Sequence, residues 1–327
     1  MHNSFKPAWW LRNPHLQTLW AALLRPKIKL SICSERLELA DGDFLDFACV
    51  GNGSGPRVLI LHGLNGSIDS PYARGILQAI NNRGWRGIFM HFRGCSGEPN
   101  RLAQSYHSGE TRDLQTVITE LIHREPNSPL FAIGYSLGGN VLLKWLGETG
   151  ESGIENSLKA AVAVSIPFEL AKTAAHLKTG FSRLYQWHLL RELSASYHRK
   201  FKDLPKPFAI RNVDVTQLKT FWEFDNAITA PLHGFKSADD YYEKSSSRQY
   251  LAKIKTPTLI LHARNDPFTT LNALPEVHEV SKHVSLELSE NGGHVGFVSG
   301  KYPWKPVYWL EDRIMDYLES YSCSGNS

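Results

Sequence analysis

Short apolar segments alternate with amphipathic ones along most of the chain. The apolar segments are continuous rather than alternating, which is the pattern of strands buried on both faces of a parallel sheet. The segments expected as strands are residues 57–62, 87–91, 130–134, 160–165, 258–262 and 284–288. The segments expected as helices are residues 111–123, 140–146 and 310–318. This order predicts an α/β fold with a mostly parallel central sheet and helices on both of its faces.

The strand pattern stops in the middle of the chain and a helical pattern replaces it. Residues there share one helical face at spacings of three and four: Phe181, Leu184, Tyr185 and Leu189. We interpret this stretch as a helical cap, or lid, inserted between two strands and lying over the active site; a purely structural extension is the alternative. The predicted core consists of residues 1–167 and 248–327, and the predicted cap between these two parts consists of residues 168–247.

Composition is that of an ordinary globular protein. Of 327 residues, 42% are hydrophobic, and 36 Lys and Arg against 32 Asp and Glu give a net charge of +4. This charge is too small to indicate a nucleic-acid partner. The apolar run at residues 16–24 is too short for a transmembrane segment. The start of the chain lacks the pattern of a secretory signal.

The cysteines and histidines do not form a metal or disulfide pattern. The 4 cysteines are scattered and make no C-x-x-C pair, which favours a reducing, cytoplasmic location: Cys33, Cys49, Cys95 and Cys323. No cluster of His, Cys, Asp or Glu has the spacing of metal ligands, so neither a metal nor another cofactor is expected. The glycine-rich run at residues 51–55 precedes a strand, so we interpret it as a connecting turn and not a phosphate-binding loop.

A serine occurs where an expected strand runs directly into a helix. The segment LFAIGYSLGGNVLL contains G-Y-S-L-G, in which Gly134 and Gly138 flank Ser136. In such a turn the serine lies at a strained apex, and the flanking positions must be small to avoid neighbouring backbone. Ser136 is therefore the candidate nucleophile.

Two further residues complete a catalytic set in the expected chain order. Asp266 follows the strand at residues 258–262, and His294 follows the strand at residues 284–288. Active sites of open α/β sheets lie at the carboxyl ends of strands, so both side chains can approach Ser136. We predict that His294 is the general base and acid and that Asp266 orients it.

An acyl-transfer site also needs N–H donors for the oxyanion. The backbone N–H of Leu137 follows the nucleophile and is the first predicted donor. The second is predicted at Leu64, where Gly63 lets the loop after an earlier strand turn toward the site; Asn65 and Gly66 are the alternatives.

These motifs together resemble the α/β-hydrolase superfamily: HGLNGS, HFRGCSGE, GYSLGGN, RNDPF and GGHVGF. The N-terminal PAWWLRNPHLQTLW and the stretch SADDYYEKSSSRQYLAKIKTPTLILHARNDPF are similar to family 4 of these hydrolases, an esterase subgroup with YheT-like bacterial members. The resemblance implies a Ser136, Asp266 and His294 triad acting on carboxylic esters. Asn140, directly after the glycines, departs from the commoner pattern and has no interpretation from the sequence.

The expected function is therefore that of a carboxylesterase-type serine hydrolase, with a small-molecule ester as its partner; a lipid-like ester is one form it could take. Acyl transfer to another acceptor, thioester hydrolysis and a non-catalytic ligand-binding homologue are the alternatives. The apolar N-terminal segment is expected to pack against the core, with peripheral membrane contact as the alternative. The basic residues of the cap are expected to be a solvated face, with an anionic head group or lipid surface as the other interpretation. The oligomeric state is left open.

Overall fold

The computed structural model of the protein describes residues 4–153 and 157–322. Its centre is an eight-stranded sheet in the order β1-β2-β4-β3-β5-β6-β7-β8, with a separate β9–β10 hairpin. Neighbouring strands from β4 to β8 are parallel, whereas β2 is antiparallel to both β1 and β4. The strands are β1 (Cys33–Glu38), β2 (Phe44–Val50), β3 (Arg57–Leu61), β4 (Arg86–Met90), β5 (Leu130–Tyr135), β6 (Leu158–Val164), β7 (Thr258–Ala263), β8 (Val284–Ser289), β9 (Val298–Tyr302) and β10 (Lys305–Tyr308).

Helices connect most of the parallel strands. The α-helices are α1 (Pro14–Leu19), α2 (Pro71–Asn82), α3 (Arg112–Arg124), α4 (Leu137–Ser152), α5 (Leu170–His176), α6 (Ser182–Lys200), α7 (Phe221–Phe224), α8 (Ala230–His233), α9 (Ala238–Ser245) and α10 (Trp309–Glu319). Short π-helices follow α1 and α7, namely η1 (Trp20–Leu24) and η4 (Asp225–Thr229). The expected strands and helices are all found. The α/β-hydrolase fold class that the sequence predicted is thereby confirmed.

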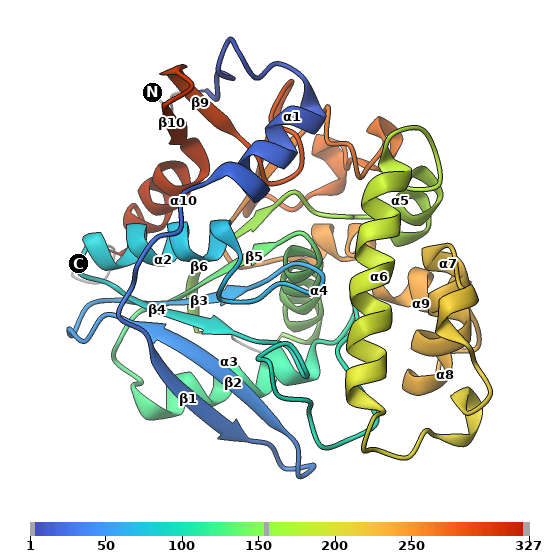
Figure 1. Cartoon of the computed structure of the whole chain (residues 1–327). Helices are drawn as coiled ribbons and strands as arrows, with labels where there is room; N and C mark the ends of the chain where they lie inside the picture. The colour runs from blue at the N-terminus through green and yellow to red at the C-terminus, as the bar shows by residue number, and fades with distance from the viewer. Residues whose placement is uncertain (1–3, 154–156, 323–327) are drawn as a thin grey trace.

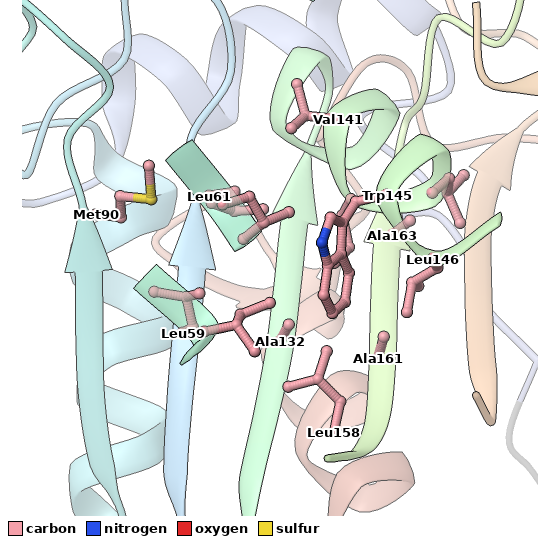
Figure 2. Packing of buried hydrophobic residues seen from close by; sticks show 14 of the residues in the cluster. Leu59, Leu61, Met90, Ala132, Val141, Trp145, Leu146, Leu158, Ala161 and Ala163 are labelled. Carbon is pink, nitrogen blue, oxygen red and sulfur yellow. The ribbon is translucent and has the colours of Figure 1, made fainter. Parts of the chain in front are cut away.

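The central strands bury both of their faces because successive side chains point to opposite sides. In β3, Leu59 and Leu61 pack in the cluster formed with α3 and α4, while Val58 and Ile60 pack in the cluster formed with α2 and α10. Figure 2 shows the first cluster, with Trp145 of α4 lying over the small side chains of β5 and β6. This double burial explains why the strands are continuously apolar in the sequence.

The segment between β6 and β7 is helical. In Figure 1 the long helix α6 runs along one side of the molecule, with α7, α8 and α9 on its outer side. These helices have their own apolar cluster, which includes Leu190 and Tyr197 of α6 and Phe221 of α7. The division of the chain at residues 168 and 247 stays a prediction.

The N-terminal segment packs partly on the core. Ala8 and Leu11 are buried beside Val298, and the rings of Trp10 and Trp20 contact each other edge to face. Trp9 remains exposed. Within the described part of the chain, no helix is long and apolar enough to cross a membrane.

Candidate active site

Ser136 occupies the sharp turn between β5 and α4. Its backbone has φ 50° and ψ −117°, outside the usual region for a residue with a side chain. The turn is held by the Ser136 N–H, which donates to the Val164 carbonyl of β6 at 2.8 Å. Strain of this kind is stored at functional sites and here presents the hydroxyl at the edge of the sheet.

The glycines on either side of the turn are needed because the backbone is crowded. A Cβ atom at Gly134 would lie 2.5 Å from the Gly138 carbonyl oxygen. A Cβ atom at Gly138 would lie 2.5 Å from the carbonyl oxygens of both Leu61 and His62. Only glycine allows α4 to start this close to β3 and β5.

His294 reaches the serine from the loop between β8 and β9. Its Nε2 atom is 3.0 Å from Ser136 Oγ. The loop is fixed by the His294 N–H, which donates to Thr18 Oγ1 of α1 at 2.9 Å. The ring of Phe268 stacks on the imidazole with a centroid distance of 3.9 Å and an interplanar angle of 1°. The imidazole is therefore held in one plane, with an edge toward the serine.

Asp266 contacts the other nitrogen of the imidazole. Its Oδ2 atom lies 2.8 Å from His294 Nδ1, and its Oδ1 atom accepts the Phe268 N–H at 2.8 Å. When His294 carries its proton on Nδ1 and donates it in a hydrogen bond to Asp266, its Nε2 atom is free to accept the serine proton. Burial raises the pKa of Asp266, but the charge of His294 and its hydrogen bond outweigh burial, so the pKa is lowered overall.

A second histidine lies behind Asp266. His262 Nδ1 accepts the Ile166 N–H at 3.1 Å, which leaves the proton on Nε2, 3.8 Å from Asp266 Oδ2. Burial lowers the pKa of His262 to about 4, while the charge of Asp266 acts in the opposite direction. The Nε2 atom hydrogen-bonds with Thr269 Oγ1 at 3.3 Å, so a neutral His262 acts on the buried carboxylate as a nearby dipole and not as its hydrogen-bond donor.

The predicted oxyanion donors lie beside the serine. Leu137 is the first residue of α4, where backbone N–H groups have no partner within the helix. The Asn65 N–H donates to the Tyr106 hydroxyl at 2.8 Å, and the Gly66 N–H donates to a carbonyl of its own turn. Among the described residues, no hydrogen-bond acceptor is found for the Leu64 N–H. These contacts favour Leu64 over the two alternatives.

His62 fixes the loop that carries Leu64. Its Nδ1 atom is 2.6 Å from the Gly63 carbonyl oxygen, and its Nε2 atom accepts the Phe92 N–H at 3.1 Å. Burial lowers the pKa of His62 to about 3, so the ring is neutral and can donate through Nδ1 and accept through Nε2. The ends of β3 and β4 are thereby tied together next to the serine.

Two cavities open beside the triad. The first, called here the cap cavity, has a volume of about 180 Å³ and lies between the sheet and helices α5 to α9. The second, the N-terminal cavity, has a volume of about 360 Å³ and lies between α1, η1 and the first half of α6. Both are lined by Leu64, Ser136 and His294 and are mostly apolar. Ser136 and His294 therefore lie where the two cavities meet, with space on each side of the serine hydroxyl.

Asn140 links three segments around the nucleophile helix. Its Nδ2 atom donates to the carbonyls of Ser108 and Ser245 at 2.8 and 2.7 Å, and its Oδ1 atom accepts the Ser247 N–H at 3.0 Å. The side chain is fully buried. Its departure from the common pattern thus has a structural reason, because it fixes the return of the chain from α9 to the core.

The cysteines and the possible metal ligands are the remaining candidate residues. Burial raises the pKa of the Cys95 thiol to about 12, which favours the structural role expected for it. Cys323 lies outside the described residues. Across residues 4–153 and 157–322 no group of His, Cys, Asp and Glu side chains is arranged to hold a metal ion.

Sequence reasoning did not find Thr18 or His262. Both lie in stretches that resemble family 4, but the resemblance assigned neither a role, and Thr18 contacts the His294 backbone across most of the chain length. The position of His262, at the end of a strand and four residues before Asp266, is the one signal that could have suggested a role.

Comparison with known families gives one clear match. Residues 56–301 match the family model described as the alpha/beta hydrolase fold. The protein named "Putative esterase YheT" from Escherichia coli (strain K12) is 43% identical over 97% of this chain and 93% of its own length. The human protein named "Phospholipase ABHD3" is 27% identical over 95% of this chain and 77% of its own length.

Solved structures agree on the architecture. The Pyrococcus furiosus esterase Pf2001 superimposes with a TM-score of 0.56 at 18% identity, covering 97% of this chain and 99% of that chain. At this identity the likeness concerns the fold alone.

Proposed function

This chain belongs to the alpha/beta hydrolase fold family, and from that premise we propose that it is a serine hydrolase that cleaves carboxylic esters through an acyl-enzyme. The family and the relatives named as esterases establish the broader class of hydrolase. The triad, the ester substrate and the carboxylesterase type are our proposal. A cytoplasmic location stays a prediction from the cysteine pattern.

One observation carries the proposal. Ser136 Oγ lies 3.0 Å from His294 Nε2, and His294 Nδ1 lies 2.8 Å from a buried Asp266 oxygen. A serine hydroxyl is a weak nucleophile unless a base accepts its proton and a third group orients that base. The alternative of a non-catalytic homologue would require the imidazole to be turned away from the serine, and this geometry opposes it.

In the first half of the reaction Ser136 Oγ attacks the ester carbonyl carbon while its proton moves to His294 Nε2. The C–O bond to the alcohol then breaks, and His294 returns the proton to the leaving alcohol. In the second half water attacks the acyl-enzyme, gives its proton to His294, and the acid is released as the proton returns to Ser136. Asp266 holds the imidazole in the required tautomer and stabilises its charged form throughout.

The backbone N–H groups of Leu137 and Leu64 are proposed to bind the negatively charged oxygen that forms in each half. Leu137 directly follows Ser136, and Leu64 lines both cavities together with it, which supports this role, since donors placed in advance lower the barrier without reorganising. The cap cavity and the N-terminal cavity would hold the acyl and alcohol groups of a small ester. Their apolar linings, together with relatives named as a phospholipase and a monoacylglycerol lipase, support a lipid-like substrate.

The proposal predicts a graded loss of activity in two variants. By analogy with serine-protease triads, Ser136→Ala should lower kcat by on the order of 10⁶-fold, and Asp266→Asn by about 10⁴-fold because it disturbs the tautomer without removing the nucleophile. Release of p-nitrophenol from short and medium acyl esters measures both.

Ser34→Ala, at an exposed serine of β1 outside both cavity linings, is the matched control and should keep near wild-type turnover. Wild-type turnover in Ser136→Ala would contradict the proposal. Adding a competing alcohol or thiol and analysing the products separates hydrolysis from acyl transfer.

A further inference from the structure

One face of helix α6 lines the cap cavity. Leu189, Leu193, Tyr197 and Lys200 fall at spacings of four, four and three, so they share one face of the helix, and all of them line this cavity. Leu189 also lines the N-terminal cavity beside Ser136 and His294. From residue 189 to residue 200 the helix rises roughly 16 Å. Lys200 is therefore far from the triad but in the same cavity.

The far end of the cavity carries positive charge. Lys200 Nζ donates to Asn100 Oδ1 at 2.7 Å and to the Gln104 carbonyl, and both of these acceptors are neutral. Arg199, which lies at the same end, donates to Ser196 Oγ at 3.0 Å. In the described part of the chain neither cation forms an ion pair with a carboxylate.

The third cation of the lining differs from these two. Arg93 forms ion pairs with Asp41, Asp43 and Asp113, so its charge is compensated. Lys200 is almost completely buried, and its ammonium has three donors of which two are used. Burial lowers the pKa of Lys200 to about 7, with Asp43 acting in the opposite direction. An unpaired ammonium at such a depth is costly unless an anion joins it.

The acidic side chain in the cavity lining does not serve as that anion. Asp225 accepts hydrogen bonds from the Thr229 and Tyr242 hydroxyls at 2.6 and 2.7 Å. The middle of the cavity, between the triad and Lys200, is lined largely by apolar residues of α6 and α7.

We propose that the cap cavity binds a straight aliphatic chain that ends in a carboxylate, with the ester at Ser136 and the carboxylate at Lys200 and Arg199. This inference rests on the proposed function for the position of the ester and adds the substrate class. The distance along α6 corresponds to a chain on the order of ten carbon atoms. A phospholipid head group fits less well, because its phosphate lies only a few bonds from the ester.

Binding can be tested without catalysis. In the Ser136→Ala protein, the affinities of monomethyl dodecanedioate and methyl dodecanoate are compared by titration calorimetry. A charge-assisted hydrogen bond predicts about tenfold tighter binding of the carboxylate ligand. Adding Lys200→Met should remove this preference and leave the affinity for methyl dodecanoate unchanged, while Lys200→Arg should keep it.

Lys202→Met is the matched control, because Lys202 is exposed just beyond the end of α6 and outside the cavity lining. If Lys200→Met does not fold, as judged by circular dichroism, Arg199→Ala at an exposed position gives the second test and should weaken the preference. The affinity for a lysophosphatidic acid should be the same with and without the Lys200→Met substitution. An ω-carboxyalkyl acetate shows whether the carboxylate chain belongs to the acyl or the alcohol side.

Equal affinity for the two esters in the Ser136→Ala protein would overturn this inference, as would a preference that survives both Lys200→Met and Arg199→Ala. Neither result bears on ester hydrolysis by the unmodified protein. Conversely, a binding preference in a protein without esterase activity would leave the carboxylate site in place and reject only the proposed catalysis.

Discussion

At the nucleophile turn, the constraint on individual residues is local. A serine between a buried strand and a helix needs small flanking residues, and the sequence supplies Gly134 and Gly138. The left-handed backbone of Ser136 agrees with that expectation. His262 was not predictable in the same way, because the direction of its ring depends on a hydrogen bond from the Ile166 N–H after β6, a distant segment, and its spacing of four from Asp266 is only a weak signal.

The crowding around Gly138 leads to a prediction at this scale. Gly138→Ala places a methyl group 2.5 Å from two carbonyl oxygens, so we expect a loss of about 1–3 kcal/mol in the free energy of unfolding and a clear loss of esterase activity. Gly53→Ala is the control, since its added Cβ would meet nothing closer than 3.7 Å. Urea unfolding and ester hydrolysis measure both. Equal stability of the two variants would show that the turn tolerates a side chain.

At the scale of elements, the parallel strands were predictable, and the antiparallel strands β1 and β2 were not predicted. The inner parallel strands β3 and β5 to β7 are largely apolar because they are buried on both faces. Strand β1 is almost entirely exposed and reads as CSERLE, which has no apolar run to mark it. Helix α1 was expected only to pack on the core, yet its Thr18 hydroxyl holds the loop of the catalytic histidine candidate. Such a contact between distant segments leaves no local signature in the sequence.

The contact between α1 and the histidine loop can be tested by a conservative change. Thr18→Val keeps the shape of the side chain but leaves the His294 N–H without its acceptor, which costs about 1–3 kcal/mol in a part-buried site. We expect kcat for ester hydrolysis to fall about tenfold through displacement of the imidazole.

Thr18→Ser should restore the rate because it keeps the hydroxyl. Thr116→Val removes an exposed hydroxyl that donates to a helix carbonyl in the same way as Thr18, and it should have no effect. Unchanged kcat in Thr18→Val would mean that the histidine loop is positioned without α1.

For the whole molecule, the topology explains how residues far apart in the chain come together. The carboxyl ends of the parallel strands β3, β5 and β7 lie on the same side of the sheet, and the loop after β8 returns to that side. The order of the motifs allowed this convergence to be predicted, as it did the fold class. The two cavities could not be predicted, because they depend on where α6 and the N-terminal segment lie over that edge.

The central claim is that Ser136 is activated by His294 in the folded molecule. Reaction of the native protein with a fluorophosphonate probe, followed by mass spectrometry of its peptides, tests this claim most directly because such probes react rapidly only with an activated serine. We predict a single phosphonylated residue, Ser136, and little labelling after His294→Ala or heat unfolding. A folded protein that stays unlabelled, or one labelled equally fast without His294, would contradict the account.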